Sequence, residues 1–209
     1  MIDKINVRKV SSQGMGANCY IVNNGDKYII IDPCVSFNNV KSMIDGKVMG
    51  IFLTHGHFDH FDCIESYLNN LNDVIVYGHK RCFEKMMSKI QNCSYYLGQN
   101  IEIDIPLDRR RCLSNESLDN IFDNYNINVI ETFGHTDCCL SYIIDDIIFT
   151  GDFLFKQTVG RTDLHTGSME TMKKSLNEIK KLTIDYLIYP GHGDFTTLND
   201  EKKNNHYMR

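Results

Sequence analysis

Histidine and aspartate gather in one short stretch of the chain, which reads T-H-G-H-F-D-H over residues 54–60. His55 and His57 are two residues apart, so on extended backbone their side chains project from one face. Asp59 and His60 follow where a helical pattern begins, so they can point at a second position close to the first. Imidazole and carboxylate ligands suit zinc, iron or manganese, and without a thiolate they do not select copper(I). This stretch therefore predicts a metal site.

Three further metal-capable residues each follow an apolar run and a glycine: His135, Asp152 and His192. Glycine lets the backbone turn sharply, and ligand sites in α/β sheets collect at strand ends. A lone histidine in such a place is more often solvated or hydrogen-bonded, and a lone carboxylate near a helix start is often only a cap. Five histidines and two aspartates at four such ends instead favour a metal centre. The remaining histidines lie outside the pattern and are expected not to bind metal: His79, His165 and His206.

The apolar runs before these residues have the length and composition of β-strands. Asn24-Gly25 separates two runs rich in β-branched and aromatic residues, 19–23 and 27–32, and predicts a hairpin. Later strand-like runs lie at 48–54, 73–78, 127–133, 140–150 and 184–190, whereas residues 91–126 give the weakest pattern. Segments with helical spacing lie at 61–71, 81–90 and 168–182, and Ser168 is suited to cap the last. Strands that first pair as a meander and then alternate with helices indicate a mixed α/β fold, with sheets covered by helices.

The helical segment at 81–90 and the residues after it carry an apolar stripe, formed by Met86, Met87, Ile90, Tyr95 and Tyr96. Packing in the core is the preferred interpretation of such a stripe. A cover over the mouth of the site is the alternative. Burial of these side chains distinguishes the two.

Length and composition restrict the class of protein. The chain has 209 residues, 42% hydrophobic and 23% charged, without repeats or linkers, so we expect one domain over residues 1–209. A net charge of −5 gives no basic surface for nucleic acid or an anionic membrane. The N-terminal residues lack the apolar stretch of a signal peptide, and no run is long enough to span a bilayer. Eight irregularly spaced cysteines then favour reduced thiols and a cytoplasmic protein.

The ordered pattern His-x-His-x-Asp-His, Gly-His-Thr, Thr-Gly-Asp and Pro-Gly-His resembles the metallo-β-lactamase superfamily over residues 10–195, nearly the whole chain. The resemblance implies an αββα sandwich of two mixed sheets flanked by helices, with two divalent metal ions at one edge. It places one metal on His55, His57 and His135, and the other on Asp59, His60 and His192, with Asp152 bridging both. Zinc is the first choice of metal, and iron or manganese are also compatible with these ligands.

Asp32, in the run I-I-I-D-P, matches an aspartate that helps to fix the metal ligands in this family. A turn residue ahead of Pro33 is the alternative role for Asp32. The sequence leaves both interpretations open.

The segment F-T-G-D-F-L-F-K-Q-T-V-G-R-T-D-L, residues 149–164, resembles the corresponding stretch of glyoxalase II-like hydrolases, especially their short bacterial forms. The family places a basic residue at the position of Arg161 near the substrate, where it could pair with a carboxylate. A salt bridge to Asp163 or Asp194 is the ordinary alternative. Only 17 residues follow His192, so we expect no C-terminal helical domain of the kind that binds glutathione.

The resemblance implies a hydrolase that attacks a thioester with a metal-bridging hydroxide, with Asp59 and Asp152 as its catalytic carboxylates. A thiolate leaves without a general acid because the pKa of a thiol is about 8.5, so a thioester suits such a site better than an amide. The expected partner is a small anionic thioester, and neither nucleic acid nor a membrane.

The sequence departs from the glyoxalase II pattern at two places, and the second of them favours another candidate. The residues after Asp59-His60 are Phe61-Asp62-Cys63, and those after His135-Thr136 are Asp137-Cys138-Cys139. The latter resembles the G-H-T-D-G-C motif of persulfide dioxygenases, in which the counterparts of His55, His135 and Asp152 hold a single iron. A mononuclear iron oxygenase is therefore the alternative function. The cysteine pair itself is expected to pack as small side chains at the start of a strand.

Overall fold

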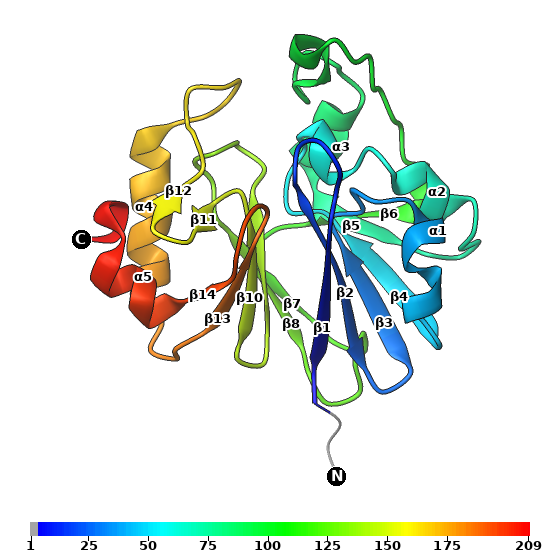
Figure 1. Ribbon diagram of the computed structural model, residues 1–209, viewed down its shortest axis with the longest axis horizontal. Coiled ribbons are helices and arrows are strands. Elements are labelled where there is room, and N and C mark those ends of the chain that lie inside the picture. Colours follow the sequence, from blue (N-terminus) through cyan, green and yellow to red (C-terminus); the bar gives the residue numbers. More distant parts are fainter. Residues whose placement is uncertain (1–3) are drawn as a thin grey trace.

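Two six-stranded β-sheets lie face to face at the centre of the structure, a computed structural model that describes residues 4–209 (Figure 1). The first three residues of the predicted domain, residues 1–209, therefore lie outside the described range. Helices cover the outer face of each sheet, on the two opposite sides of the molecule in Figure 1. This is the αββα sandwich that the sequence predicts.

The first sheet has the strand order β1-β2-β3-β4-β5-β6. Its strands are β1 (Asn6–Ser11), β2 (Asn18–Asn24), β3 (Lys27–Ile31), β4 (Lys47–Phe52), β5 (Val76–His79) and β6 (Arg110–Leu113). The first three strands form an antiparallel meander, and β3 to β6 run parallel. The sheet is therefore mixed, and the parallel half directs the C-terminal end of β4 toward one edge of the sandwich.

The second sheet has the order β14-β13-β10-β9-β8-β7. Its strands are β7 (Glu116–Leu118), β8 (Ile127–Glu131), β9 (Leu140–Ile144), β10 (Ile147–Gly151), β13 (Leu187–Pro190) and β14 (Thr196–Thr197). All neighbours are antiparallel except β10 and β13, which run parallel. A small hairpin, β11 (Leu154–Phe155) and β12 (Thr158–Val159), follows the end of β10.

The helices are short apart from α4. They are α1 (Phe37–Val40), α2 (Ile64–Leu68), α3 (Lys80–Met86), α4 (Met169–Lys180) and α5 (Leu198–Asn204), with 3-10 turns at Lys41–Met43, Phe58–His60, Ser94–Leu97, Leu107–Arg109 and His206–Met208. Within residues 4–209, no helix is long and apolar enough to cross a membrane.

Three apolar layers hold this sandwich together. The middle layer lies between the sheets and includes Phe52 and Tyr142. A second layer lies between the first sheet and α1 to α3, and a third joins the second sheet to α4 and α5. Burial on both faces explains why most of the strand sequences are continuous apolar runs rather than alternating ones.

The structure confirms the hairpin at Asn24-Gly25 and the strand-like runs, with one correction. Residues 140–150 are not one strand but the hairpin of β9 and β10. Asp145 turns the chain there with a φ of 56°, and aspartate tolerates this left-handed region better than most residues. The continuous apolar pattern on both sides of the turn hid it.

The predicted helices are present, although two of them are shorter than expected. The segment 61–71 is helical only over α2, and 81–90 only over α3, whereas α4 extends nearly as predicted. The Ser168 hydroxyl accepts a hydrogen bond from the Thr171 amide at 3.2 Å, which confirms its role as a cap. The sequence missed β1, a largely exposed edge strand.

Removal of one buried hydroxyl tests the junction between the sheets. The Tyr142 hydroxyl on β9 donates to the Leu53 carbonyl after β4 at 2.6 Å, and Tyr142 is fully buried. Tyr142→Phe leaves that carbonyl without this partner, so we expect the free energy of unfolding in urea to fall by about 1–3 kcal/mol. Tyr95→Phe is the control, because its exposed side chain predicts a change within about 0.5 kcal/mol. Equal free energies of unfolding for the two variants would contradict this interpretation.

Candidate metal centre

Every predicted metal ligand lies at one edge of the sandwich, where the two sheets meet. His55, His57, Asp59 and His60 follow β4 of the first sheet. The other three follow strands of the second sheet: His135 after β8, Asp152 after β10 and His192 after β13. The four strand ends that looked alike in the sequence therefore converge in space.

Three histidines form the first group of donors. The His57 Nδ1 atom lies 3.2 Å from His55 Nε2 and 2.9 Å from His135 Nε2. The three side chains are almost completely buried, and their donor atoms all lie within 4.8 Å of one another. The group has the nitrogen donors and the compactness of a metal site with an open position.

The second group contains Asp59, His60 and His192, whose donor atoms also lie within 4.8 Å of one another. The Asp59 Oδ2 atom is 3.3 Å from His192 Nε2 and 3.8 Å from His60 Nε2. His60 is fully buried, whereas His192 retains 28% side-chain exposure, so this group is the more accessible of the two.

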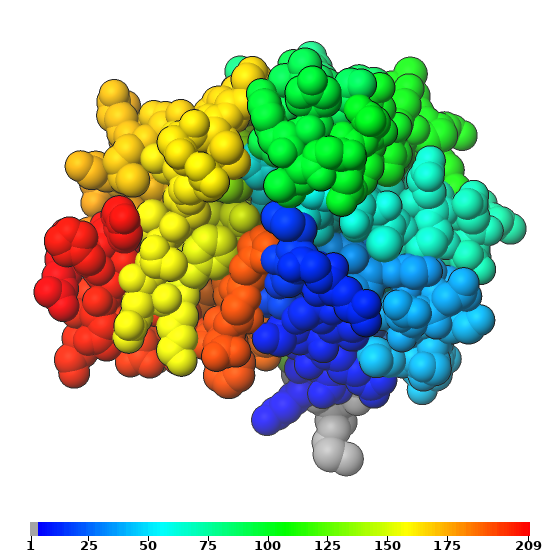
Figure 2. Space-filling model, turned by 45° about the horizontal axis from the view of Figure 1, so that its top comes forward, coloured from blue at the N-terminus to red at the C-terminus, as the bar shows by residue number. Residues whose placement is uncertain are grey.

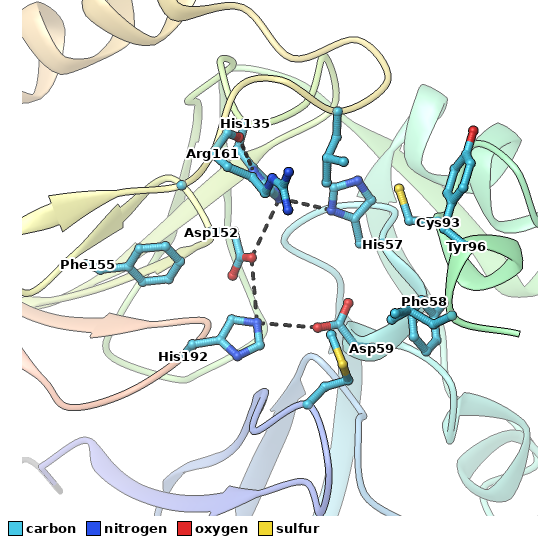
Figure 3. Close-up of a pocket in the computed structure, with 14 residues that line it drawn as sticks. His57, Phe58, Asp59, Cys93, Tyr96, His135, Asp152, Phe155, Arg161 and His192 are labelled. Carbon is cyan, nitrogen blue, oxygen red and sulfur yellow. Dashed lines mark hydrogen bonds and ion pairs between the residues drawn. The ribbon is translucent and has the colours of Figure 1, made fainter. Parts of the chain in front are cut away.

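Asp152 lies between the two groups (Figure 3). Its Oδ2 atom is 3.6 Å from His135 Nε2 and 3.6 Å from His192 Nε2, and its Oδ1 atom is 3.3 Å from His60 Nε2. One carboxylate thus faces donors of both groups. This is the arrangement expected of a ligand shared by two ions.

The residues present fit a metal, because several buried polar atoms lack a hydrogen bond among the described residues. His57 Nε2, His60 Nε2 and Asp152 Oδ1 are buried without one, although the last two atoms lie 3.3 Å apart, and this arrangement costs free energy unless another group satisfies them. Gly191 leaves this space open: a Cβ there would lie 2.2 Å from Asp152 Oδ1 and 2.7 Å from His60 Cε1. The site therefore has orphaned nitrogen and oxygen donors in a space that a side chain would fill.

Electrostatics divide the histidines into two kinds. Burial holds the pKa of His55 well below its ordinary value and lowers that of His57 to about 3, so both are neutral donors. Burial also disfavours a charged His60, but the carboxylates of Asp152 and Asp59 outweigh it and raise its pKa well above the usual range. The pKa of His192 is raised as well, because its hydrogen bond to Asp59 and the Asp152 charge outweigh its burial.

The carboxylates are ionised for the complementary reason. Burial alone would raise the pKa of Asp152, but the neighbouring imidazoles, above all His60, hold it well below the ordinary value. The pKa of Asp59 is lowered in the same way by His60 and His192, against its burial. Two anionic side chains and neutral imidazoles are the forms that bind divalent cations.

Asp32 has the geometry that both interpretations of the sequence require. Its backbone has a φ of 51°, so it does turn the chain after β3. Its carboxylate also accepts hydrogen bonds from the Thr54 amide at 2.8 Å and hydroxyl at 2.6 Å, and lies 2.9 Å from His60 Nδ1. The contact fixes the His60 ring with Nε2 directed at the donor group.

Glycine is required at the end of β10. Gly151 has a φ of 50°, and a Cβ there would lie 2.4 Å from the Thr54 hydroxyl. Only the absent side chain lets the chain turn against Thr54 and direct Asp152 into the centre.

Five of the seven donor residues line a cavity of about 460 Å³: His57, Asp59, His135, Asp152 and His192. Loops near residues 15, 95, 160 and 193 surround its mouth, and they meet on the face that Figure 2 brings forward. Arg161 lines this cavity, but its Nε and Nη2 atoms donate to Asp163 at 2.7 and 2.8 Å on the exposed surface. Its backbone carbonyl lies 2.7 Å from His135 Nδ1. The salt bridge to Asp163 that the sequence offered as one role of Arg161 is therefore present. Arg161 also lines the cavity, as the substrate-binding role requires.

The sequence misplaced most of the apolar stripe after residue 85. Met86 is buried in the core, as expected, but Met87, Ile90, Tyr95 and Tyr96 are 42–65% exposed. Helix α3 ends at Met86, so the residues after it no longer follow the helical spacing on which the core interpretation depended. Tyr96 instead lines the mouth of the cavity, which was the alternative interpretation.

A buried lysine near the site was also missed. The Lys85 ammonium group lies 3.1 Å from Asp137 Oδ1 and donates to the Thr166 hydroxyl at 3.0 Å, with only 3% of the side chain exposed. It joins α3 to the loops that carry His135 and Arg161. Its charge within an apolar helical stripe was the signal available in the sequence. Cys138 and Cys139 are buried beside this loop, as expected.

Asp32→Asn tests the support of His60. Asparagine tolerates the same backbone angle but lacks the charge that holds the imidazole, so we expect zinc affinity, measured by competition with a chelator, to fall about 10- to 100-fold. Asp145→Asn is a matched control, because Asp145 also has a positive φ, of 56°, but lies in an exposed turn. Equal zinc affinities for the two variants would show that Asp32 acts only as a turn residue.

Comparison with known proteins agrees with this architecture. The family profile described as the Metallo-beta-lactamase superfamily matches residues 13–192. A probable metallo-hydrolase of Streptococcus pyogenes serotype M6 is 30% identical over 204 residues, covering 92% of this chain and 86% of the relative. GloC, a hydroxyacylglutathione hydrolase of Haemophilus influenzae, is 28% identical over 215 residues, covering 98% of both chains.

Solved structures share the fold over almost their whole length. The B3 metallo-beta-lactamase BLEG-1 has a TM-score of 0.86 at 27% identity, covering 97% of this chain and 99% of its own. The protein TTHA1623, solved in a di-iron-bound form, has a TM-score of 0.83 at 26% identity, covering 96% and 100%. With the profile spanning most of the chain and the donor clusters at the meeting edge of the sheets, this protein belongs to the metallo-beta-lactamase superfamily of metal-dependent hydrolases.

Proposed function

We propose that this protein is a thioester hydrolase similar to glyoxalase II, working with two divalent metal ions. The observation that carries the proposal is the position of Asp152, whose two oxygens face donors of both groups at 3.3–3.6 Å. A relative that is a hydroxyacylglutathione hydrolase and matches 98% of both chains supports the thioester class.

In this proposal each donor group holds one ion. His55, His57 and His135 would hold the first, Asp59, His60 and His192 would hold the second, and Asp152 would contribute a ligand to each. Zinc suits these nitrogen and oxygen donors, and iron and manganese are compatible with them. Bound here, two such ions lower the pKa of water toward 7 and polarise a carbonyl oxygen.

The protein's own side chains would orient the reactants. Asp152 and Asp59 are the proposed catalytic carboxylates: both are anionic and line the cavity, where they can accept a proton from water. The thiolate product needs no protonation on departure because thiols have a pKa of about 8.5, whereas an amide nitrogen must receive a proton. The cavity walls beside the donors are mainly apolar, which suits the thioester better.

We also propose that the chain acts as one domain on a small-molecule substrate in the cytoplasm. The cavity of about 460 Å³ is in the range of small-molecule sites. All eight cysteines are free in the described structure, in accord with a reducing compartment.

Metal binding is expected to release protons. In the metal-free protein the neighbouring carboxylates raise the pKa values of His60 and His192 and so favour the protonated rings, and a ring must lose its proton to bind metal. Zinc affinity should therefore fall as pH decreases from about 8 to 6. Calorimetry in buffers of unequal ionisation enthalpy measures the released protons, and a binding enthalpy independent of the buffer would contradict the proposal.

Loss of a ligand should abolish thioester hydrolysis. We expect His135→Ala and Asp152→Ala to lower kcat/KM for a small thioester by at least about a hundredfold, since each removes a contact to a catalytic ion. The control is His206→Ala, an exposed histidine that does not line the cavity, and this variant should retain full activity. Near-normal activity in His135→Ala would overturn the assignment. Oxygen consumption with persulfides, and one iron per chain, would instead establish the dioxygenase alternative.

Arg161 is proposed to bind a substrate carboxylate in exchange for Asp163. We expect Arg161→Ala to raise KM about tenfold for a thioester that carries a carboxylate, with kcat unchanged. Asp163→Asn frees the guanidinium and should lower the same KM. An uncharged thioester serves as the control substrate, with KM unaffected by either variant. If KM for the anionic thioester is also unchanged in Arg161→Ala, the residue has only a structural role.

A further inference from the structure

Large apolar side chains surround the donor groups at the cavity. We call these residues the apolar rim: Met15, Phe58, Tyr96, Leu97, Phe155 and Leu164. Figure 3 shows Phe155 beside His192 on one side of the centre, and Phe58 and Tyr96 on the other. A substrate whose reacting carbonyl reaches the donors must therefore pass between apolar walls.

Several rim side chains are exposed to solvent, which is unfavourable for apolar groups. Tyr96 is 65% exposed, Leu97 53% and Met15 48%. Exposed apolar residues that gather around a cavity, rather than scattering singly over the surface, mark a binding surface.

The backbone under Tyr96 and Leu97 is nonetheless fixed. Asn92 is fully buried, its Nδ2 atom donates to the Ile101 carbonyl at 2.8 Å, and its Oδ1 atom accepts from the Ser94 amide at 2.9 Å. The Asn92 carbonyl accepts from the Phe58 amide at 3.0 Å, inside the segment that carries His57 and Asp59. The rim is thus anchored to the donor loop and positioned before substrate arrives.

The cavity offers little that could recognise a strongly charged substrate. Among the described residues that line it, Arg161 is the one permanent cation, and its Nε and Nη2 atoms already donate to Asp163. A glutathione thioester carries two carboxylates and an ammonium group. Such a thiol would leave most of its charges without a partner along apolar walls, which is unfavourable.

We propose that the apolar rim binds an apolar portion of the substrate, so that this enzyme prefers thioesters with aliphatic or aromatic groups and at most one carboxylate over glutathione thioesters. This inference rests on the proposed thioester hydrolysis. The apolar group can belong to the acyl part or to the thiol, and the same side chains would contact either.

The test varies the two halves of the substrate separately. Zinc-loaded protein is assayed with acetyl, butanoyl and hexanoyl thioesters of N-acetylcysteamine, an uncharged thiol, then with benzyl mercaptan and glutathione carrying one fixed acetyl group. Burial of each methylene group can raise kcat/KM by up to about fourfold. We therefore expect kcat/KM to rise at least tenfold either from the acetyl to the hexanoyl thioester or from the N-acetylcysteamine to the benzyl mercaptan thioester. The glutathione thioester should be the poorest acetyl substrate.

Two variants connect the preference to the rim. In the double variant Tyr96→Ala with Leu97→Ala, the ratio of kcat/KM for the hexanoyl over the acetyl thioester, or for benzyl mercaptan over N-acetylcysteamine, should fall by at least threefold. Tyr95→Ala is a matched control, because Tyr95 is 55% exposed next to Tyr96 but does not line the cavity. Its substrate preference should be unchanged.

A binding measurement separates this inference from the chemistry. A ketone analogue of the hexanoyl thioester, with a methylene in place of sulfur, is titrated by calorimetry into wild type and the double variant, and weaker binding in the variant supports the rim. Equal kcat/KM for all acyl chains and thiols, or a glutathione preference of tenfold or more, overturns this inference but leaves thioester hydrolysis intact. Failure to hydrolyse any thioester overturns both proposals.

Discussion

Seven imidazole and carboxylate side chains share one largely buried corner between the two sheets, and the cost of taking them out of water is the constraint on which the structure depends. Unpaired buried polar groups are costly, and buried charges more so. The Asp32 carboxylate offsets part of this cost by holding Thr54 and His60, each through a short hydrogen bond. Three buried atoms without a hydrogen bond, His57 Nε2, His60 Nε2 and Asp152 Oδ1, belong to these side chains, and a bound metal would satisfy them.

The two sheets are fastened at the same corner. The Leu140 amide donates to the Thr54 carbonyl at 2.8 Å, which ties the second sheet to the donor loop of the first. On the other side, the Asn18 amide donates to the Gly191 carbonyl at 2.7 Å, and the Tyr20 hydroxyl donates to the Pro190 carbonyl at 2.5 Å. Donors carried by different sheets therefore keep fixed separations, as a site with preorganised ligands requires.

Local patterns predicted the parts of this protein that local chemistry determines. The donors could be found because each follows a strand end that also carries a glycine, and the mixed α/β fold because its strands are apolar runs that alternate with helical patterns. The αββα sandwich itself was implied by the resemblance to the metallo-β-lactamase superfamily. The rim was anticipated only at Tyr96, as an alternative, since the backbone there depends on Asn92, whose side chain bonds to Ile101 nine residues later. The turn at Asp145 was hidden because both flanking strands are apolar. Lys85 was missed because its partners lie in loops 52 and 81 residues away in sequence.

Chemistry and selectivity occupy different layers of the site. The buried floor has nitrogen and oxygen donors that suit two cations, whereas the exposed rim is apolar and anchored through Phe58 to the same loop. Elemental analysis of protein purified without added metal tests the central claim most directly. The account predicts about two divalent ions per chain, as zinc or as a mixture with iron or manganese. One iron per chain, or no metal after mild purification, would contradict it.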